Sequence, residues 1–203
     1  MMRELGIDPV PIDVGGMLQR SVATLYSHLV TRPTGRAVRL AIESQLAEVS
    51  RCALSLIDLS EVTVLDFSCA DEVVAKLLLR FLEEDRPGDA YFVLRGLGEQ
   101  HREPITTALE RQNLLAVAQL DGAGFELIGA RTAIEESTWE TLEEAGHVRA
   151  DRVMEIFPDE PELLALAVLV ERRVVVRHVD SDGYYALSAL ARDLPAHPSN
   201  AKE

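Results

Sequence analysis

The chain has 203 residues, 47% of them hydrophobic, and its 34 acidic and 20 basic residues give a formal net charge of −14. This length and apolar content allow a buried core and one or two small domains. Excess negative charge repels nucleic-acid phosphates and anionic lipids, because both bind proteins through Lys and Arg. We therefore expect a protein partner or a small ligand rather than nucleic acid, and no membrane partner.

Residues 1–16 contain two prolines and little periodicity, which predicts a lead-in or an edge segment. They lack the basic and apolar runs of a signal peptide, and the longest apolar run, residues 163–170, is too short to span a bilayer. We expect a cytoplasmic protein. The two cysteines, Cys52 and Cys69, lack the paired spacing of a zinc or redox site and predict ordinary buried thiols.

Residues 17–130 predict an α/β unit with a mixed sheet, because strand patterns alternate with helical ones. Residues 23–31 favour a strand, although the leading part, MLQRSVATL, could also be helical. Further along, we expect helices at 36–49, 69–81 and 104–112, and Pro104 stands at the first position of the last helix. Strands are expected at 53–58, 90–94 and 115–120. Residues 63–65 belong to a short connection, and a hairpin-like segment ends near Gly129.

The pattern changes after Ala130, where we place a domain boundary. Residues 131–194 predict three helices and a hairpin, and the tail at 195–203 predicts disorder. Ser137 and Glu140 have the spacing of a capping box for the first helix. The second and third helices are expected at 150–157 and 162–172, and an Asp-Gly turn joins hairpin strands at 174–179 and 184–187.

Ser68 follows a strand pattern in the stretch VTVLDFSCAD and has three interpretations. Its hydroxyl could cap the next helix, since Ser68-x-x-Asp71 is a capping box. A helix N-terminus also suits a phosphate, although Asp71 and Glu72 would repel one and make phosphorylation disruptive. A nucleophile is disfavoured because no G-x-S-x-G elbow and no nearby histidine accompany Ser68.

The element order and the pattern V-T-x-x-D-x-S at a helix start resemble the STAS domain of bacterial anti-sigma factor antagonists over residues 17–130. In that family a D-S-S-G connection carries a serine that is phosphorylated by a kinase, which is also the anti-sigma factor. The resemblance implies this role for Ser68, with Asp66 as the family's aspartate, although Asp66 could equally be a structural acceptor for amides in the turn. Phe67 and Cys69 depart from the pattern, and D-F-x-x-A-D-E is closer to a STAS-like group of uncharacterised bacterial proteins.

The resemblance implies a partner, an anti-sigma factor or a serine kinase, and a contact surface. We assign to that surface Asp66, Ser68, Asp71, Glu72, Arg95, Gly96 and Gly98. The last three also fit an ordinary turn, since the loop lacks the third glycine of a dinucleotide fingerprint. No cofactor is expected. The histidines, His28, His101, His147, His178 and His197, are scattered, which predicts surface positions and no metal site.

Two arginine groups are further candidates. Arg32 and Arg36 could bind an anion at a helix start, or simply pair with carboxylates. Residues 131–194 are similar to a winged helix, in which Arg172, Arg173 and Arg177 would be candidates for DNA contact. The segment from 131 to 203 has 8 basic and 15 acidic residues, a net charge of −7, and its third helix is almost wholly apolar. These features favour a protein-contact or dimerisation module over a DNA-binding one.

The sequence therefore predicts a STAS-like mixed sheet with packed helices, followed by a small winged-helix-like α+β domain. The expected function is that of a non-enzymatic regulatory protein acting through protein contacts, with phosphorylation of Ser68 as a possible control. The alternative is a transcription regulator that uses its winged helix on DNA. An enzyme is not expected, because the sequence presents no catalytic constellation.

Overall fold

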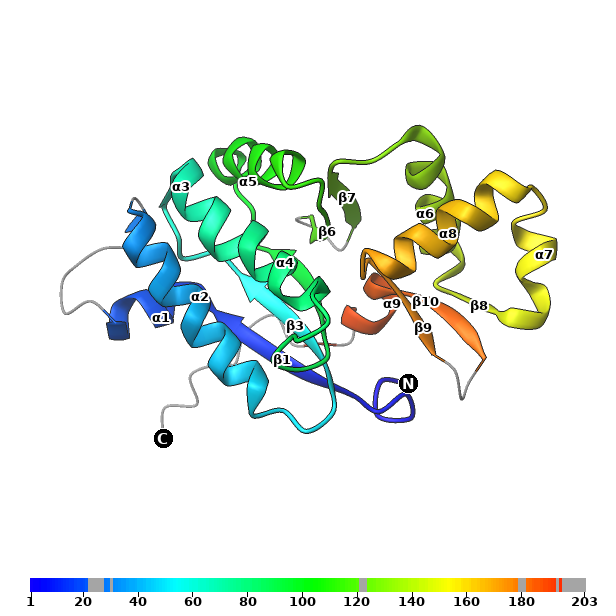
Figure 1. Cartoon of the computed structure of the whole chain (residues 1–203), viewed down its shortest axis with the longest axis horizontal. Coiled ribbons are helices and arrows are strands. Elements are labelled where there is room, and N and C mark those ends of the chain that lie inside the picture. Colours follow the sequence, from blue (N-terminus) through cyan, green and yellow to red (C-terminus); the bar gives the residue numbers. More distant parts are fainter. Residues whose placement is uncertain (22–27, 30, 121–123, 179–181, 193, 195–203) are drawn as a thin grey trace.

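The computed structural model describes residues 1–21, 28–29, 31–120, 124–178, 182–192 and 194. It is a mixed α/β protein, as the sequence predicts (Figure 1). The main sheet has five strands in the spatial order β1 (Ile7–Asp13), β3 (Cys52–Asp58), β5 (Ala90–Arg95), β6 (Leu115–Gln119) and β7 (Phe125–Gly129). The first four run parallel, and β7 returns antiparallel beside β6.

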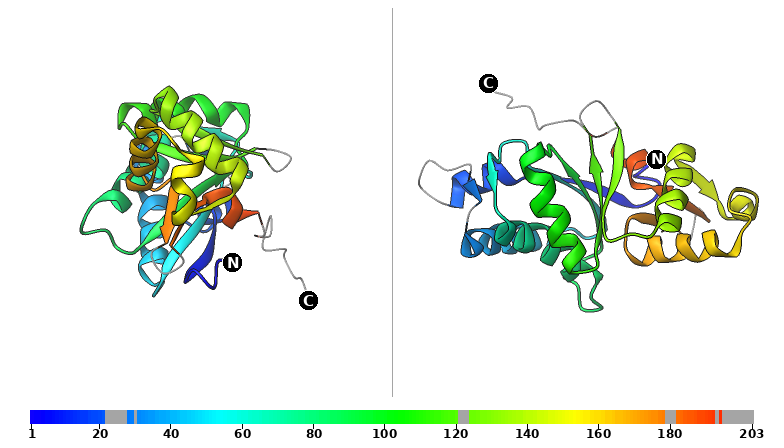
Figure 2. Two further views of the ribbon diagram at one scale, coloured as in Figure 1. Left: turned by 90° about the vertical axis from the view of Figure 1, so that its right-hand side faces the viewer. Right: turned by 90° about the horizontal axis from the view of Figure 1, so that it is seen from above.

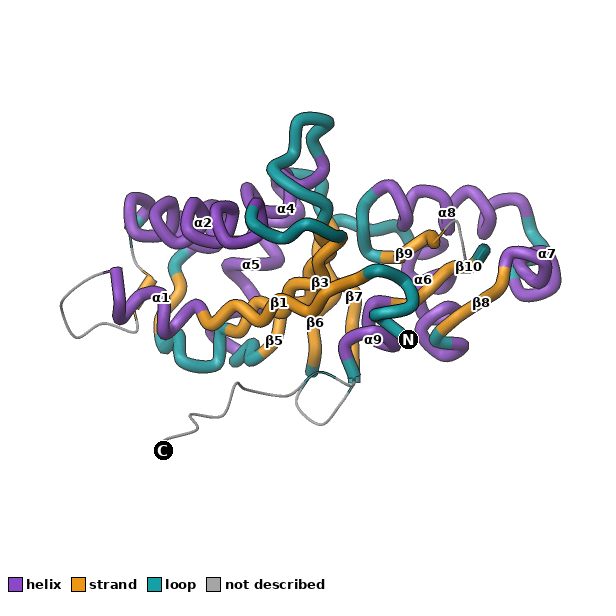
Figure 3. The backbone as a smooth tube through the Cα atoms, turned by 90° about the horizontal axis from the view of Figure 1, so that it is seen from below, coloured by secondary structure: helices purple, strands orange, loops and turns teal. Residues whose placement is uncertain are grey.

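Helices connect the parallel strands. They are α1 (Val14–Ser21), α2 (Arg32–Ala47), the continuous run of α3 (Phe67–Ala70), the π-helix η1 (Asp71–Ala75) and α4 (Lys76–Leu82), and then α5 (Glu99–Arg111). The parallel strands follow chain order across the sheet, so right-handed crossovers place α2, α4 and α5 on one face. Figure 3 shows α2 and α4 together on one side of the strands. A short parallel pair, β2 (His28–Leu29) and β4 (Val64–Leu65), lies beside them.

The C-terminal elements form a second group (Figure 1). In chain order they are α6 (Ala133–Ala145), β8 (His147–Arg149), the 3-10 turn η2 (Ala150–Arg152), α7 (Val153–Ile156), α8 (Glu160–Glu171), β9 (Val175–His178), β10 (Gly183–Ala186) and α9 (Leu187–Ala191). The three strands pair antiparallel in the order β8-β10-β9. Strand β8 was not predicted, and the hairpin was.

Two hydrophobic cores lie on the two faces of the main sheet. Ile12, Ile57 and Leu94 belong to the core under the helices. Leu54, Leu56 and the other alternate strand residues point the opposite way and pack with Trp139, Phe157, Leu166 and Leu187. Helix α9 also contacts β3, β5 and β6. The segment after residue 130 therefore shares a core with the sheet.

Several predicted boundaries were wrong. Helix α2 begins at Arg32, four residues earlier than expected, because Thr31 caps it and Pro33 stands in its first turn. Pro104 lies inside α5, which already begins at Glu99. The capping box of α6 is formed by Thr132 and Glu135, not by Ser137 and Glu140.

Some predictions fall outside the described residues: most of the strand at 23–31, the tip of the hairpin turn and the tail at 195–203. In the part of the chain that is described, no helix combines the length and apolarity needed to cross a bilayer.

Candidate functional site

The junction between β4 and α3 is capped by Asp66, not by Ser68. Asp66 has extended backbone angles, φ −83° and ψ 166°, and its Oδ1 accepts the amide of Cys69 at 2.8 Å. Ser68 is already the second residue of the helix. The predicted capping box of Ser68 and Asp71 is therefore not formed, because the acceptor two residues earlier takes the cap position.

Ser68 nevertheless belongs to the cap. Its Oγ donates to Asp66 Oδ1 at 2.9 Å, so one carboxylate oxygen holds both the serine hydroxyl and the first-turn amide of Cys69. Ser68 is half-buried. Any group added to the hydroxyl removes this donor and stands beside the Asp66 carboxylate.

The two residues that flank Ser68 anchor the junction. Phe67 is half-buried against the core under the helices, and the guanidinium of Arg111 lies 4.4 Å from its ring centroid. Cys69 is fully buried, and its Sγ donates to the Thr31 carbonyl, which joins α3 to the start of α2. Burial, with the nearby Asp66 carboxylate, raises the pKa of Cys69 to about 11, so its thiol is protonated at neutral pH.

Asp71 and Glu72 are buried rather than open to a partner, with relative exposures of 7% and 3%. Arg32 Nη1 donates to Asp71 at 2.8 Å and to Glu72 at 2.9 Å. Lys76 Nζ lies 2.5 Å from Glu72 Oε1, and Arg39 Nε lies 3.5 Å from Glu72 Oε2. Asp71 and Glu72 thus bind α2 to η1 through ion pairs.

The neighbouring cations lower the pKa of Glu72. Burial alone would raise the pKa of Glu72, but hydrogen bonds from Lys76 and Arg32 outweigh it and lower the pKa. Arg32 pairs with carboxylates of its own chain. Of the two interpretations of Arg32, anion binding and pairing with carboxylates, the structure shows the second. Arg36 is exposed and has no ion pair among the described residues.

Gly35 allows α2 to approach the Ser68 helix. A Cβ at Gly35 would lie 3.1 Å from Glu72 Cβ and 3.2 Å from Cys69 Cα. These contacts are tighter than ordinary van der Waals distances and involve the backbone. The sequence did not single out Gly35 for this reason, because its neighbours are more than thirty residues away along the chain.

Arg95, Gly96 and Gly98 hold the loop after β5. Arg95 is buried and donates from Nε to Asp58 Oδ2 at 3.0 Å. Gly96 has a φ of +66°, and a Cβ there would meet Ser60 N at 2.5 Å. The Gly98 amide donates to His101 Nδ1 at 3.1 Å. Arg95 therefore does not present its guanidinium to a partner, and the turn interpretation fits the two glycines.

His101 corrects the prediction that the histidines lie on the surface. It is 1% exposed, and its Nε2 donates to the Val62 carbonyl at 2.7 Å while Nδ1 accepts from Gly98. The ring thus fixes the start of α5 to the segment before β4. Its place at the third helical position after Gly98 was the only local signal for this role.

Two of the three arginines that were candidates for DNA contact bind other residues of the same chain. Arg172 pairs with Glu135 and donates to the Asn113 carbonyl at 2.7 Å. Arg173 donates to the Ala90 carbonyl at 2.9 Å and lies over the Tyr91 ring. Arg172 thus joins the C-terminal elements to the turn before β6, and Arg173 joins them to β5. Arg177 is exposed, with its guanidinium 5.8 Å from the Tyr184 ring centroid.

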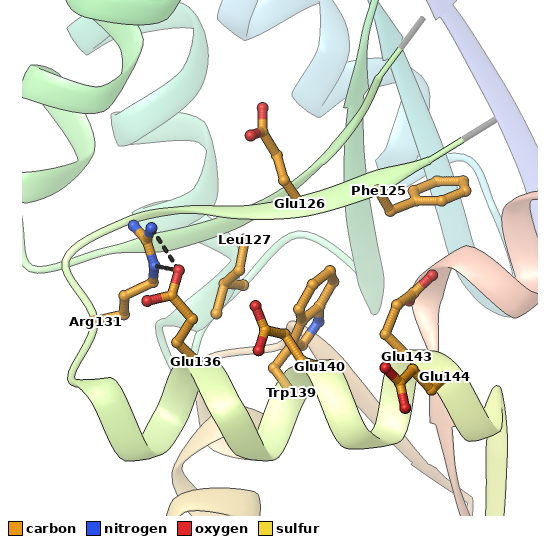
Figure 4. Close-up of a pocket in the computed structure, with 9 residues that line it drawn as sticks. All are labelled: Phe125, Glu126, Leu127, Arg131, Glu136, Trp139, Glu140, Glu143 and Glu144. Atoms are coloured by element: carbon orange, nitrogen blue, oxygen red, sulfur yellow. Dashed lines mark hydrogen bonds and ion pairs between the residues drawn. The ribbon is translucent and has the colours of Figure 1, made fainter. Parts of the chain in front are cut away.

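A pocket of about 480 Å³ lies between β7 and α6, and the sequence did not predict it (Figure 4). It is lined by Phe125, Glu126, Leu127, Arg131, Glu136, Trp139, Glu140, Glu143 and Glu144. Arg131 pairs with Glu136, and Glu143 with Arg192. The remaining negative charge favours cations over anions. The run of glutamates in α6 was the available signal.

No group of three or more His, Cys, Asp or Glu side chains within the described ranges is placed to hold a metal ion. Comparison with protein-family models, with curated proteins and with solved structures gives no match.

Proposed function

We propose that this chain is a non-enzymatic regulatory protein that binds a partner protein through a STAS-like unit, with the contact surface around Ser68. Two features support a STAS-like unit. Parallel strands alternate with helices and end in the β6–β7 hairpin. In addition, Asp66 and Ser68 stand where a strand gives way to a helix on the crossover between β3 and β5.

The observation that carries the proposal is the hydrogen bond between Ser68 and the helix-capping carboxylate of Asp66. A phosphate on Ser68 would place a dianion beside Asp66 and weaken the cap. The repulsion expected from Asp71 and Glu72 is smaller than their proximity in sequence implies, since Arg32, Lys76 and Arg39 neutralise them. Phosphorylation would thus act on the cap and on the surface beside it.

Fewer residues are exposed on the proposed contact surface than the sequence indicated. Asp66 and Ser68 are half-buried, and the side chain of Arg32 is 49% exposed. Asp71, Glu72 and Arg95 are buried and would support this surface from below. The segment around Ser68 resembles that of STAS domains, and this resemblance implies a cytoplasmic partner of the anti-sigma factor or serine-kinase class.

The experiment is phosphorylation by extract of the native cell with ATP, read by intact mass. We expect the mass of one phosphate on the wild type and none on Ser68→Ala. Ser137→Ala is the matched control, because Ser137 is an exposed serine in the first turns of another helix. If Ser68→Ala accepts as much phosphate as the wild type, the switch at Ser68 is wrong.

The alternative, a transcription regulator, is favoured by the C-terminal order helix, strand, two helices and hairpin, which fits a winged helix. Its basic residues are a weaker support, because Arg172 and Arg173 serve intramolecular contacts. Titration of duplex DNA at low ionic strength tests it. Binding that weakens with salt and with Arg177→Ala would favour this alternative.

A further inference from the structure

Helix α8 presents an apolar ridge to solvent. Leu164 is 61% exposed and Val168 is 36% exposed, one helical turn apart, with exposed Ala167 beside them. The opposite face of α8, with Leu166 and Leu169, is buried in the second core. An apolar run all round a helix needs partners on more than one side, and the core supplies only one.

The ridge borders a groove of about 820 Å³. Val168 lines it together with Ala133 at the start of α6 and Glu110 near the end of α5. The groove therefore opens where α6, α8 and α5 meet, and Val168 belongs to both the ridge and the groove. Figure 2, left, looks onto the end of the molecule where α6 and α8 pack against each other.

Negative charge frames this apolar surface. Exposed Glu160 and Glu171 lie about one helical turn before Leu164 and after Val168, and exposed Glu110 lines the groove. None of these three glutamates has an ion pair among the described residues. The arginines that line the groove, Arg131 and Arg172, are paired with Glu136 and Glu135. Such a surface repels phosphates, anionic lipids and a second copy of the same acidic face. It complements a segment that is apolar on one side and basic around it.

We infer that the α6–α8 surface docks a basic amphipathic helix of a partner protein. Leu164 and Val168 would meet the apolar stripe of the bound helix, and Lys or Arg side chains beside that stripe would lie over Glu160, Glu171 and Glu110. This surface is separate from the one around Ser68 and does not depend on it. It assigns to the winged-helix-like elements a protein ligand in place of DNA.

A labelled amphipathic peptide of leucine and lysine, titrated by fluorescence anisotropy, tests the inference. Leu164→Glu with Val168→Glu adds negative charge but removes the apolar contact. We expect at least about a tenfold weaker binding, equivalent to about 1.4 kcal/mol. Leu40→Glu with Leu79→Glu is the matched control, at positions 47% and 36% exposed on the helices of the sheet. This control should leave the affinity unchanged or slightly higher.

The charge of the variants makes the result decisive. Non-specific attraction to an acidic protein predicts tighter binding for both double variants, and that result would overturn the inference. Equal binding of a scrambled peptide of the same composition would overturn it too. Sedimentation over a concentration series completes the test, because a wild-type dimer abolished by the α8 variant would identify a second copy as the occupant. All four substituted residues are exposed, and thermal unfolding verifies that the variants fold.

Discussion

Ser68 Oγ and the amide of Cys69 share one acceptor, Asp66 Oδ1, at 2.9 and 2.8 Å. Replacing Asp66 with alanine removes both hydrogen bonds and the cap, whereas replacing Ser68 removes only one. We predict that Asp66→Ala lowers the free energy of unfolding by about 2 kcal/mol and Ser68→Ala by about 1 kcal/mol or less. Urea denaturation measures both. A larger loss for Ser68→Ala would mean that Ser68 is the cap after all.

Glu72 gives the protein a pH-dependent contribution to stability. Its pKa is lower in the folded protein than in the unfolded chain, because the hydrogen bonds of Lys76 and Arg32 outweigh the effect of burial. The contribution is therefore present above the unfolded pKa of about 4.3 and is lost as pH falls through the folded pKa. We predict that Glu72→Gln costs about 1–3 kcal/mol at neutral pH, since its partners are partly exposed.

Denaturation of the wild type and Glu72→Gln at several pH values measures this contribution. The difference between them should narrow as the solution becomes more acidic than about pH 4. Glu155→Gln is the control, because Glu155 forms an exposed ion pair with Arg152 and should change stability little. A difference that stays constant with pH would contradict the role given to Glu72.

Gly35→Ala should destabilise the protein although alanine favours helices by about 1 kcal/mol. The added Cβ would lie 3.1 Å from Glu72 Cβ and 3.3 Å from Cys69 Sγ, in a region closed by the ion pairs of Arg32. Ser44→Ala, at an exposed position on the same helix, should be neutral or stabilising. Thermal unfolding compares the two. A higher melting temperature for Gly35→Ala would show that α2 can move away.

Arg173 should matter for folding rather than for nucleic acid. It is half-buried against Ala90 and Tyr91 of the main sheet, so Arg173→Ala should lower the free energy of unfolding by about 1–3 kcal/mol. Arg177→Ala, at an exposed position on β9, should have little effect. Equal stabilities for the two variants would remove the evidence that Arg173 joins the C-terminal elements to the sheet.

Both cysteines should resist alkylation in the folded protein. Burial, reinforced by Asp89, raises the pKa of Cys52 to about 12, and burial with Asp66 raises that of Cys69 to about 11. Thiolates are the reactive form, so iodoacetamide at pH 8 should label the native protein far more slowly than the denatured one. Intact mass over time measures the rates. Rapid labelling of the native protein would mean that these sites open readily.

The local patterns predicted most elements but not every edge of the fold. Residues 90–94 and 115–120 are apolar runs, and both form strands. The prolines Pro9 and Pro11 predict a lead-in or an edge segment without deciding between them, and the structure has the edge strand β1 there. Both prolines are exposed, and among the described strands β1 pairs with β3 alone, at the sheet edge, where prolines are tolerated.

The helix start at Asp66 and Ser68 was predicted, but the contacts around it were not. The sequence placed Asp66 and Ser68 at a helix start, but two capping residues two positions apart compete there and only the backbone decides between them. Arg32 lies 39 and 40 residues from its partners Asp71 and Glu72. A local pattern carries no information on such pairs. The local pattern therefore indicated Asp71 and Glu72 as contact residues, whereas both are buried in the folded protein.

The surface around Ser68 is proposed to bind a partner protein, with its charge controlling this binding. A quantitative pull-down from native-cell extract, comparing wild type, Ser68→Asp and the control Ser137→Asp, tests it most directly. We expect that at least one protein retained by the wild type and by Ser137→Asp is lost or strongly reduced with Ser68→Asp. Identical retained proteins for all three baits, with each bait folded, would contradict it.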